Sequence, residues 1–251
     1  EDPMMNAKAY SVGLLVAEGY LTDRGRSKRV GISMVEGDAL DVVESVCEQS
    51  GVSTSRQVRT SPNPHWQPVT QLRLTGWGED FEACKDKCDT KKVPDWVLED
   101  RRLFAPFLAG FFDGDGHVRK REGGREIILT STSKSLIQQL LSMLADSGVH
   151  GKTMELAGDS RQEHWLPCES VYVGGHHATR LAQAMLPFTA IDYKREELAR
   201  IADFDGRDLG VSTDRFPAAA VWQELSKHHL GSGWYKDSEG NKFRLGIRYP
   251  N

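Results

Sequence analysis

The sequence is poor in cysteine, has no long apolar run and carries no excess of positive charge. Its four cysteines include one close pair, Cys84 and Cys88, but no further cysteine or histidine pair at zinc-binding spacing completes a site. No apolar run approaches the roughly 20 residues of a membrane-spanning helix, so we expect no membrane association. The first residues lack the basic and apolar segments of a secretory signal, and we expect a cytoplasmic protein with free thiols.

The formal net charge of −4 argues mildly against a nucleic-acid partner, because binding to phosphates needs clustered cations. The cations are nevertheless gathered in two short segments, residues 24–29 and 119–125. Two solvated hairpins would explain either segment alone. The position of the segments relative to other features therefore decides what they indicate.

An internal repeat relates the two cationic segments to each other. Residues 13–19 (GLLVAEG) and 110–116 (GFFDGDG) both read small, apolar, apolar, any residue, small, acid, glycine, and their acids are 97 residues apart. A cationic segment follows each acid, and the Gly-Val pairs at 51–52 and 148–149 are again 97 residues apart. The chain therefore contains one unit twice.

The repeat predicts an α+β fold of two pseudo-symmetric αββαββα halves, residues 8–98 and 99–205, followed by an extension at 206–251. Expected helices are 10–18, 39–49 and 80–87 in the first half and 103–115, 135–146 and 178–186 in the second, with a glycine in left-handed conformation after the middle helix of each half. Expected hairpins are 20–35 and 117–133, and expected strand pairs are 56–59 with 71–75 and 152–156 with 170–173. In the extension we expect a helix at 221–229 and a hairpin at 234–249.

The repeated motif places two acids where a cation would be needed. Gly13 and Gly110 each stand four residues before another small residue, so each helix has a strip without bulk and the two helices can pack closely. Glu18 and Asp115 would then be neighbours at two helix C-termini, which already carry partial negative charge. A bound Mg²⁺ would offset that repulsion. The alternative is that each acid merely solvates a turn.

At these residues the chain resembles the LAGLIDADG homing endonucleases of the single-chain, double-motif kind. Residues 108–116 (LAGFFDGDG) are close to the name motif, 11–19 (SVGLLVAEG) match it more loosely, and the resemblance covers about residues 8–204. It implies two motif helices at the interface of the halves and a β-saddle from each half in the DNA major groove. It further implies a monomer that cuts both strands of a long, asymmetric or pseudo-palindromic duplex, leaving short 3′ overhangs. Mg²⁺ or Mn²⁺ would support cleavage, and Ca²⁺ would bind without supporting it.

The resemblance assigns the metal to the ends of the motif helices. Glu18 and Asp115 would hold it, with the adjoining Gly19 and Gly116 as further ligands.

Further catalytic roles are implied later in each repeat. A lysine of the family near the site is matched by Lys194 and, in the first repeat, by Lys91 or Lys92. We favour Lys92, because the family often has lysine, one apolar residue and then proline. A polar position near the active-site water is matched by Glu36 and Ser133.

Contacts to DNA bases would come from strand side chains, with arginine and lysine preferring guanine. The candidates are Arg24, Arg26, Lys28, Arg29, Arg56, Arg59, Arg73, Arg119, Arg121, Arg125 and Lys152. Because side chains alternate along a strand, about half of them should face DNA.

Residues 92–110 and 212–217 are similar to endonuclease domains inserted in inteins, although no splicing-junction residues are present. The cations and aromatic residues of the extension would enlarge the DNA footprint or, alternatively, belong to a capping subdomain. Two other classes remain open: an RNA-binding intron maturase and a non-catalytic DNA-binding regulator on the same scaffold. Neither would need both acids.

Overall fold

The computed structural model describes residues 2–23, 28–60, 62–63, 65–75, 89–121, 124–156, 167–203, 233–236 and 242–245. The chain divides into two compact units, residues 1–210 and residues 211–251. None of the helices in the described ranges is long and apolar enough to cross a membrane.

The first unit contains the predicted repeat. The first half runs α1 (Pro3–Glu18), β1 (Tyr20–Asp23), β2 (Lys28–Met34), α2 (Gly37–Gln49), β3 (Ser53–Arg59) and β4 (Val69–Thr75). The second half runs α4 (Phe104–Asp115), β5 (Gly116–Arg121), β6 (Gly124–Ser131), α5 (Lys134–Asp146), β7 (Lys152–Leu156), β8 (Cys168–Gly174) and α6 (Gly175–Met185). The antiparallel sheets have equivalent strand orders, β1-β2-β4-β3 and β5-β6-β8-β7, which confirms the predicted fold class.

Four helical elements were not predicted at their observed positions. The first helix begins at Pro3 rather than at residue 10, because Asp2 caps it by accepting hydrogen bonds from the next backbone N–H groups. The short α3 (Asp95–Leu98) and the 3₁₀ helix η2 (Arg101–Leu103) join the halves. The helix α7 (Asp192–Ala202) was missed because its buried face includes a lysine and only two apolar residues. The predicted helices 80–87 and 221–229 lie outside the described residues.

Glycines end the middle helix of each half as predicted. Gly51 has φ +69° and Gly148 has φ +70°, the left-handed region that glycine adopts without strain. The next residues, Val52 and Val149, donate backbone hydrogen bonds of 2.8 Å into the last turns of α2 and α5. This hydrogen bond satisfies a carbonyl that the end of the helix leaves free.

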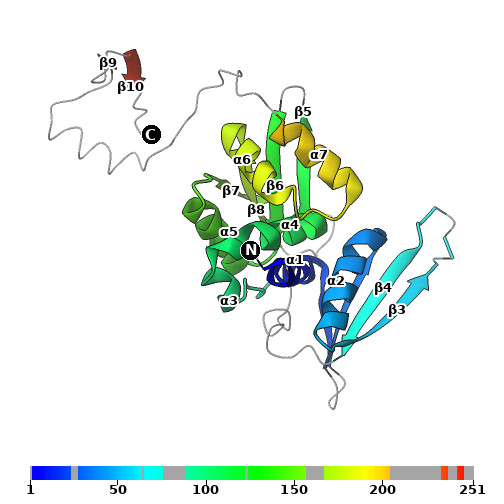
Figure 1. The fold of residues 1–251 in the computed structure, drawn as a ribbon. Helices are drawn as coiled ribbons and strands as arrows, with labels where there is room; N and C mark the ends of the chain where they lie inside the picture. Colours follow the sequence, from blue (N-terminus) through cyan, green and yellow to red (C-terminus); the bar gives the residue numbers. More distant parts are fainter. Residues whose placement is uncertain are drawn as a thin grey trace. The chain divides into compact units, whose positions relative to one another are not determined.

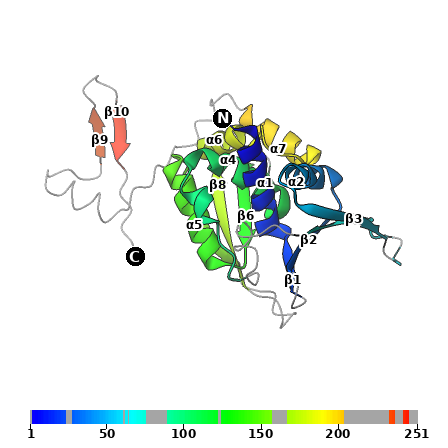
Figure 2. The same cartoon turned by 60° about the horizontal axis from the view of Figure 1, so that its bottom comes forward.

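The two motif helices lie side by side at the centre of the first unit (Figures 1 and 2). A Cβ atom added to Gly110 would lie 1.9 Å from the carbonyl oxygen of Tyr10, and one added to Gly13 would lie 2.1 Å from that of Phe107. Only glycine allows such contact between backbones. The expected close packing of the two glycine strips is confirmed.

Each sheet packs one face into the hydrophobic core. In the first sheet Val30, Ile32, Leu72 and Leu74 belong to the hydrophobic core, and in the second Ile127, Leu129, Val171 and Val173 do. The alternation of side chains puts the residues between them on the opposite face. We call these opposite surfaces the outer face of the first sheet and the outer face of the second sheet.

In the second unit, β9 (Gly233–Lys236) and β10 (Lys242–Leu245) pair in antiparallel register. The strands of the hairpin expected at 234–249 are thereby confirmed.

Candidate functional site

Two carboxylates meet where the motif helices end. Glu18 is the last residue of α1 and Asp115 the last of α4, and both side chains are exposed. Glu18 lies against the end of α4: a Cβ atom added to Gly114, the residue before Asp115, would lie 3.1 Å from Cγ of Glu18. Loss of hydration, and then the charge of Glu18, raises the pKa of Asp115 to about 6. The pair therefore forms an open site at which a positive charge is favoured.

Lys194 lies buried behind the end of α4, with only 5% of its surface exposed. Its ammonium donates hydrogen bonds to the carbonyl oxygens of Phe112 (2.8 Å), Asp113 (2.8 Å), Gly114 (3.1 Å) and Gly116 (3.1 Å). Burial lowers the pKa of this lysine, while the nearby carboxylates act in the opposite direction. The cation satisfies the free carbonyls of the helix end and opposes the helix dipole.

Lys91 holds the end of α1 in the same way. It is 7% exposed, and its ammonium donates to the carbonyl oxygens of Ala17 (3.1 Å) and Gly19 (3.0 Å). Lys92, which the spacing before proline favoured, has an exposed side chain instead. The correction follows from the alternation along this segment, in which Lys91 and Val93 are buried and the residue between them turns outward.

The carbonyl oxygens of Gly19 and Gly116, which the resemblance implies as further metal ligands, are already hydrogen-bonded in the structure. The carbonyl oxygens of both glycines accept hydrogen bonds from lysine, from Lys91 and Lys194 respectively. A positive charge already next to each oxygen disfavours a metal ion at the same atom. The carboxylates remain as the candidate metal ligands.

The two residues predicted to lie near the active-site water, Glu36 and Ser133, differ in their exposure. Ser133 is fully buried: its hydroxyl donates to the carbonyl oxygen of Lys91 (2.6 Å) and caps α5 by accepting from Leu136 N. A direct contact with an active-site water is therefore corrected to a structural role. Glu36 is partly exposed at the start of α2. Burial and then the charge of Glu36 raise the pKa of Tyr193, whereas burial lowers the pKa of Lys194 and the charge of Glu36 opposes that lowering.

The basic candidates of the first sheet separate by face. Arg29, Arg59 and Arg73 border a hollow on the outer face, together with Tyr20 and Gln71.

Arg56 lies on the other face, where it forms ion pairs with Asp41 and Glu44 of α2. Its assignment to DNA is corrected, because its guanidinium is already neutralised on the helix side. Arg24 and Arg26 lie outside the described residues, and only the backbone of Lys28 is described.

In the second sheet the outer face holds Arg119 and Lys152. Arg119 donates to Glu126 at 2.9 Å and lies over the ring of Tyr172, whereas Lys152 is exposed. Arg125 alternates onto the core face with Ile127 and Leu129, so its assignment to DNA is corrected as well. For Arg121 only the backbone is described.

Comparison with known families adds to this geometry. The family model described as "LAGLIDADG-like domain" matches residues 104–183, which span α4 to α6. Residues 104–183 form a LAGLIDADG-like domain. Its structure has the fold of the homing endonuclease I-DmoI in complex with DNA and Ca (TM-score 0.52, 14% identity, 74% of this chain and 91% of that chain). It is likewise similar to I-WcaI bound to its DNA recognition sequence (TM-score 0.55, 14% identity, 76% and 86%).

Two other proteins are similar over different lengths. Full-length DUF199/WhiA from Thermatoga maritima has a TM-score of 0.56 at 13% identity, over 91% of this chain and 69% of that chain. A curated relative, a subunit of the A-type ATP synthase of Methanopyrus kandleri, is 29% identical over 180 residues. The chain spans 15% of the length of that relative.

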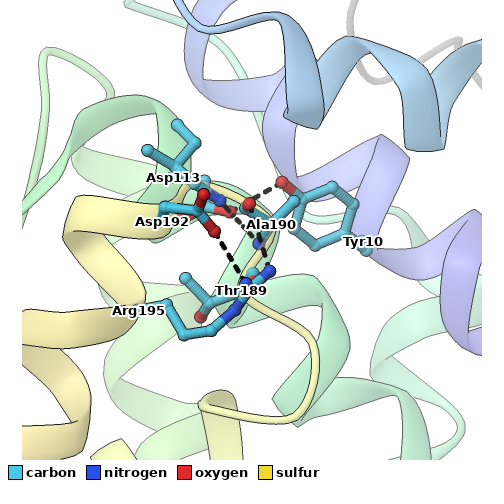
Figure 3. A network of polar contacts seen from close by, with 7 residues as sticks. Tyr10, Asp113, Thr189, Ala190, Asp192 and Arg195 are labelled. Atoms are coloured by element: carbon cyan, nitrogen blue, oxygen red, sulfur yellow. Dashed lines mark hydrogen bonds and ion pairs between the residues drawn. The ribbon is translucent and has the colours of Figure 1, made fainter.

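Within the LAGLIDADG motif of the second half, the first acid forms a buried network that the sequence did not predict (Figure 3). Oδ2 of Asp113 accepts hydrogen bonds from the hydroxyl of Tyr10 (2.6 Å) and the backbone N–H groups of Ala190 (2.7 Å) and Ile191 (3.3 Å). Burial raises the pKa of Asp113, and these donors oppose that effect. The network joins α1, α4 and the segment that leads to Lys194.

Arg195 fixes the same segment. It donates to the carbonyl oxygens of Thr189 (2.9 Å) and Ala190 (3.2 Å) and to the carboxylate of Asp192 (2.8 Å), as Figure 3 shows. The sequence signal that could have revealed the network is the mismatch between the repeats, since Val16 stands where the second motif has Asp113.

Proposed function

We propose that the protein is a site-specific endonuclease that cuts both strands of a long, asymmetric DNA duplex with a divalent metal ion, Mg²⁺ or Mn²⁺. The observation that carries the proposal is the placement of Glu18 and Asp115. They stand side by side, exposed, at the ends of two helices in backbone contact through Gly13 and Gly110. Two neighbouring acids at two helix C-termini repel each other and the helix dipoles, and a cation bound between them would offset that cost.

The residues present fit a hard divalent ion. Carboxylate oxygens are the ligands that Mg²⁺ prefers, and it keeps several positions for water and phosphate oxygens. Among the described residues no group of three His, Cys, Asp or Glu side chains is arranged around a metal, so Glu18 and Asp115 alone would hold it. When bound, the ion would supply an activated water and neutralise charge on the phosphate.

The surrounding side chains orient these two acids. Lys91 and Lys194 satisfy the helix-end carbonyls, and the buried network at Asp113 attaches α7 to α4. The outer faces of the two sheets would hold the duplex on either side of the site. The DNA-bound states of I-DmoI and I-WcaI support this proposal, as do structures of I-DmoI with Ca, Mn and Mg.

Finer features belong to the same proposal. One chain supplies both halves, so we infer a monomer. Short 3′ overhangs, a cytoplasmic location, an origin as an intein-borne endonuclease and a contribution of residues 206–251 to the DNA footprint are likewise proposed.

The decisive experiment is cleavage of a randomised duplex library by the whole chain with Mg²⁺ or Ca²⁺. Wild type would be compared with Asp115→Asn and Glu18→Gln. Asp146→Asn is the matched control, since Asp146 is also an exposed acid at the end of a helix. We expect double-strand cuts at one long site with Mg²⁺, loss of cutting in both motif variants and full cutting in the control. Equal cutting by Asp115→Asn would refute the assignment of the site.

A non-catalytic DNA-binding regulator is the second candidate. It is favoured by one observation: Lys194 gives its hydrogen bonds to four carbonyl oxygens and is not poised to donate to a phosphate. Selective duplex binding without cleavage in any metal would move the assignment there. Selective binding of structured RNA instead would move it to an intron maturase.

A further inference from the structure

The outer face of the first sheet gathers positive charge without acids. Arg29, Arg59 and Arg73 border one hollow, and none of them forms an ion pair with a carboxylate among the residues that the structure describes. The other described positions of that face, on β2, β3 and β4, are glycine, serine, threonine, glutamine and Val69. In a chain with four more acids than bases, so local an excess of cations indicates an acceptor-rich partner.

The second sheet lacks this cluster at equivalent positions. Arg29 pairs across the ladder with Thr75, and its counterpart 97 residues on is Glu126, which pairs with Gly174. Arg73 pairs with Gly31, and its counterpart is Tyr172, which pairs with Ile128, the residue equivalent to Gly31.

With Glu126 in place of Arg29 and Tyr172 in place of Arg73, the outer face of the second sheet is less positive than that of the first. Glu126 also engages the one arginine described on that face, Arg119, at 2.9 Å. The two outer faces therefore differ in both charge and hydrogen-bonding capacity.

The hollow in the first sheet is also lined by the aromatic ring of Tyr20 and the amide of Gln71. A Cβ atom on Gly31 would lie 2.5 Å from the ring of Tyr20, so the ring lies directly against the strand there. The hydroxyl of Tyr20 is hydrogen-bonded to the amide of Gln71. Gln71 is 6% exposed, and its amide oxygen Oε1 has no hydrogen-bond partner in the described part of the chain. A buried acceptor without a partner is costly unless a ligand donates a hydrogen bond to it.

We propose that the first sheet binds a guanine-bearing half-site through Arg29, Arg59 and Arg73, and that the second sheet binds its half-site without an equivalent cluster. The proposal rests on the endonuclease function above and adds the chemical difference between the two halves of the target. In the major groove, guanine presents O6 and N7, two acceptors that match the paired donors of a guanidinium.

The spacing of the arginines suits neighbouring base pairs. Arg29 and Arg73 are diagonal neighbours on adjacent strands, a separation of about 7–8 Å between backbones. Base pairs rise by about 3.4 Å along the helix, so the two side chains would reach positions about two base pairs apart. Arg59, opposite Val69 at the far end of the ladder, would reach further along the same half-site.

The test is a binding selection with the full chain, a randomised duplex library and Ca²⁺, so that no cutting is needed. Wild type, Arg29→Ala and Arg73→Ala would be compared with Arg119→Ala of the second sheet. Arg56→Ala is the matched control, because it removes an arginine from the opposite face of the first sheet. Bound sequences and the salt dependence of affinity would be measured for each variant.

We expect one half-site to be enriched in guanine, with each first-sheet variant losing roughly 5- to 150-fold discrimination at one position of that half-site only. Arg56→Ala should keep the wild-type preference. A uniform loss of affinity with unchanged preference and a smaller salt dependence would mean phosphate contacts and would overturn the proposal. Relaxed preference in both half-sites, or in neither, would overturn it too. Wild-type protein that selects no duplex would instead refute the endonuclease function itself.

Discussion

The contact between the motif helices predicts a large effect of one methyl group. In Gly110→Ala, the new Cβ would lie 1.9 Å from the carbonyl oxygen of Tyr10 and 2.9 Å from the backbone nitrogen of Leu14. Ordinary contacts are about 3.5 Å, so the helices must separate by on the order of 1.5 Å. Overpacking costs about 1–3 kcal/mol, and more where the neighbour is backbone that cannot rotate away. Taking the upper end of that range, and because alanine regains about 1 kcal/mol of helix propensity, we expect a net loss of about 2 kcal/mol.

Cleavage should suffer more than stability, because the same separation moves Glu18 away from Asp115. A displacement of about 1 Å at a reacting site costs roughly 100-fold in rate. Urea unfolding and cleavage of the selected target measure the two effects. Gly51→Ala is the control: with φ +69° and nothing within 4 Å of its Cβ, it should cost about 1–2 kcal/mol of strain and leave cleavage unchanged. A Gly110→Ala protein with wild-type stability and full cleavage would refute the backbone contact.

Three further substitutions test the helix ends. Lys91→Met should destabilise the protein by about 1–3 kcal/mol because buried carbonyls lose their donor, whereas Lys92→Met should be neutral in the same urea titration. Asp115→Asn should stabilise metal-free protein: an acid whose folded pKa is raised from 3.8 to about 6 loses stability as pH rises through that window, and after allowance for solvent screening we expect a gain of about 1 kcal/mol at pH 7. A thermal-unfolding series from pH 4 to 7 in which wild type and variant run parallel would contradict the raised pKa. Tyr10→Phe should cost about 1–3 kcal/mol through its lost bond to Asp113, and unchanged urea midpoints would argue against that hydrogen bond.

The repeat made most of the fold predictable. Glycine, apolar spacing and charge recur at a fixed offset, so weak signals in one half are supported by those in the other, as at Gly51 and Gly148. The polar helix α7 was missed because periodicity detects apolar stripes, and this helix buries only Leu198 and Ile201 beside Lys194.

Within the site, the acids were predictable and their supports were not. Glu18 and Asp115 stand next to a glycine in each motif, so one-dimensional spacing located them. Which of Lys91 and Lys92 points toward the site depends on which face of this extended segment is buried. Two adjacent lysines in a sequence do not reveal that face. The sorting of arginines depended on strand register, since Arg56 and Arg59 differ only in the face on which they stand.

Side chains of each half form hydrogen bonds that hold site residues of the other half. The hydroxyl of Ser133, from the second half, holds the backbone of Lys91, whose ammonium closes α1 of the first. The hydroxyl of Tyr10, from the first half, bonds to Asp113 of the second. At the positions equivalent to this last pair stand Phe107 and Val16, so the tyrosine–aspartate contact exists once where the repeat would allow it twice.

That asymmetry matters because Asp113 is buried among the residues that hold Lys194 and precedes Asp115 on the same helix. A second half without α1 would leave a buried carboxylate with two backbone donors and no hydroxyl, and burial of a charge with fewer donors is strongly unfavourable. The second carboxylate of the site is therefore held in place partly by the first helix. The repeat thus produced two similar halves, and the exchange of supporting side chains between them makes each half incomplete as a site on its own.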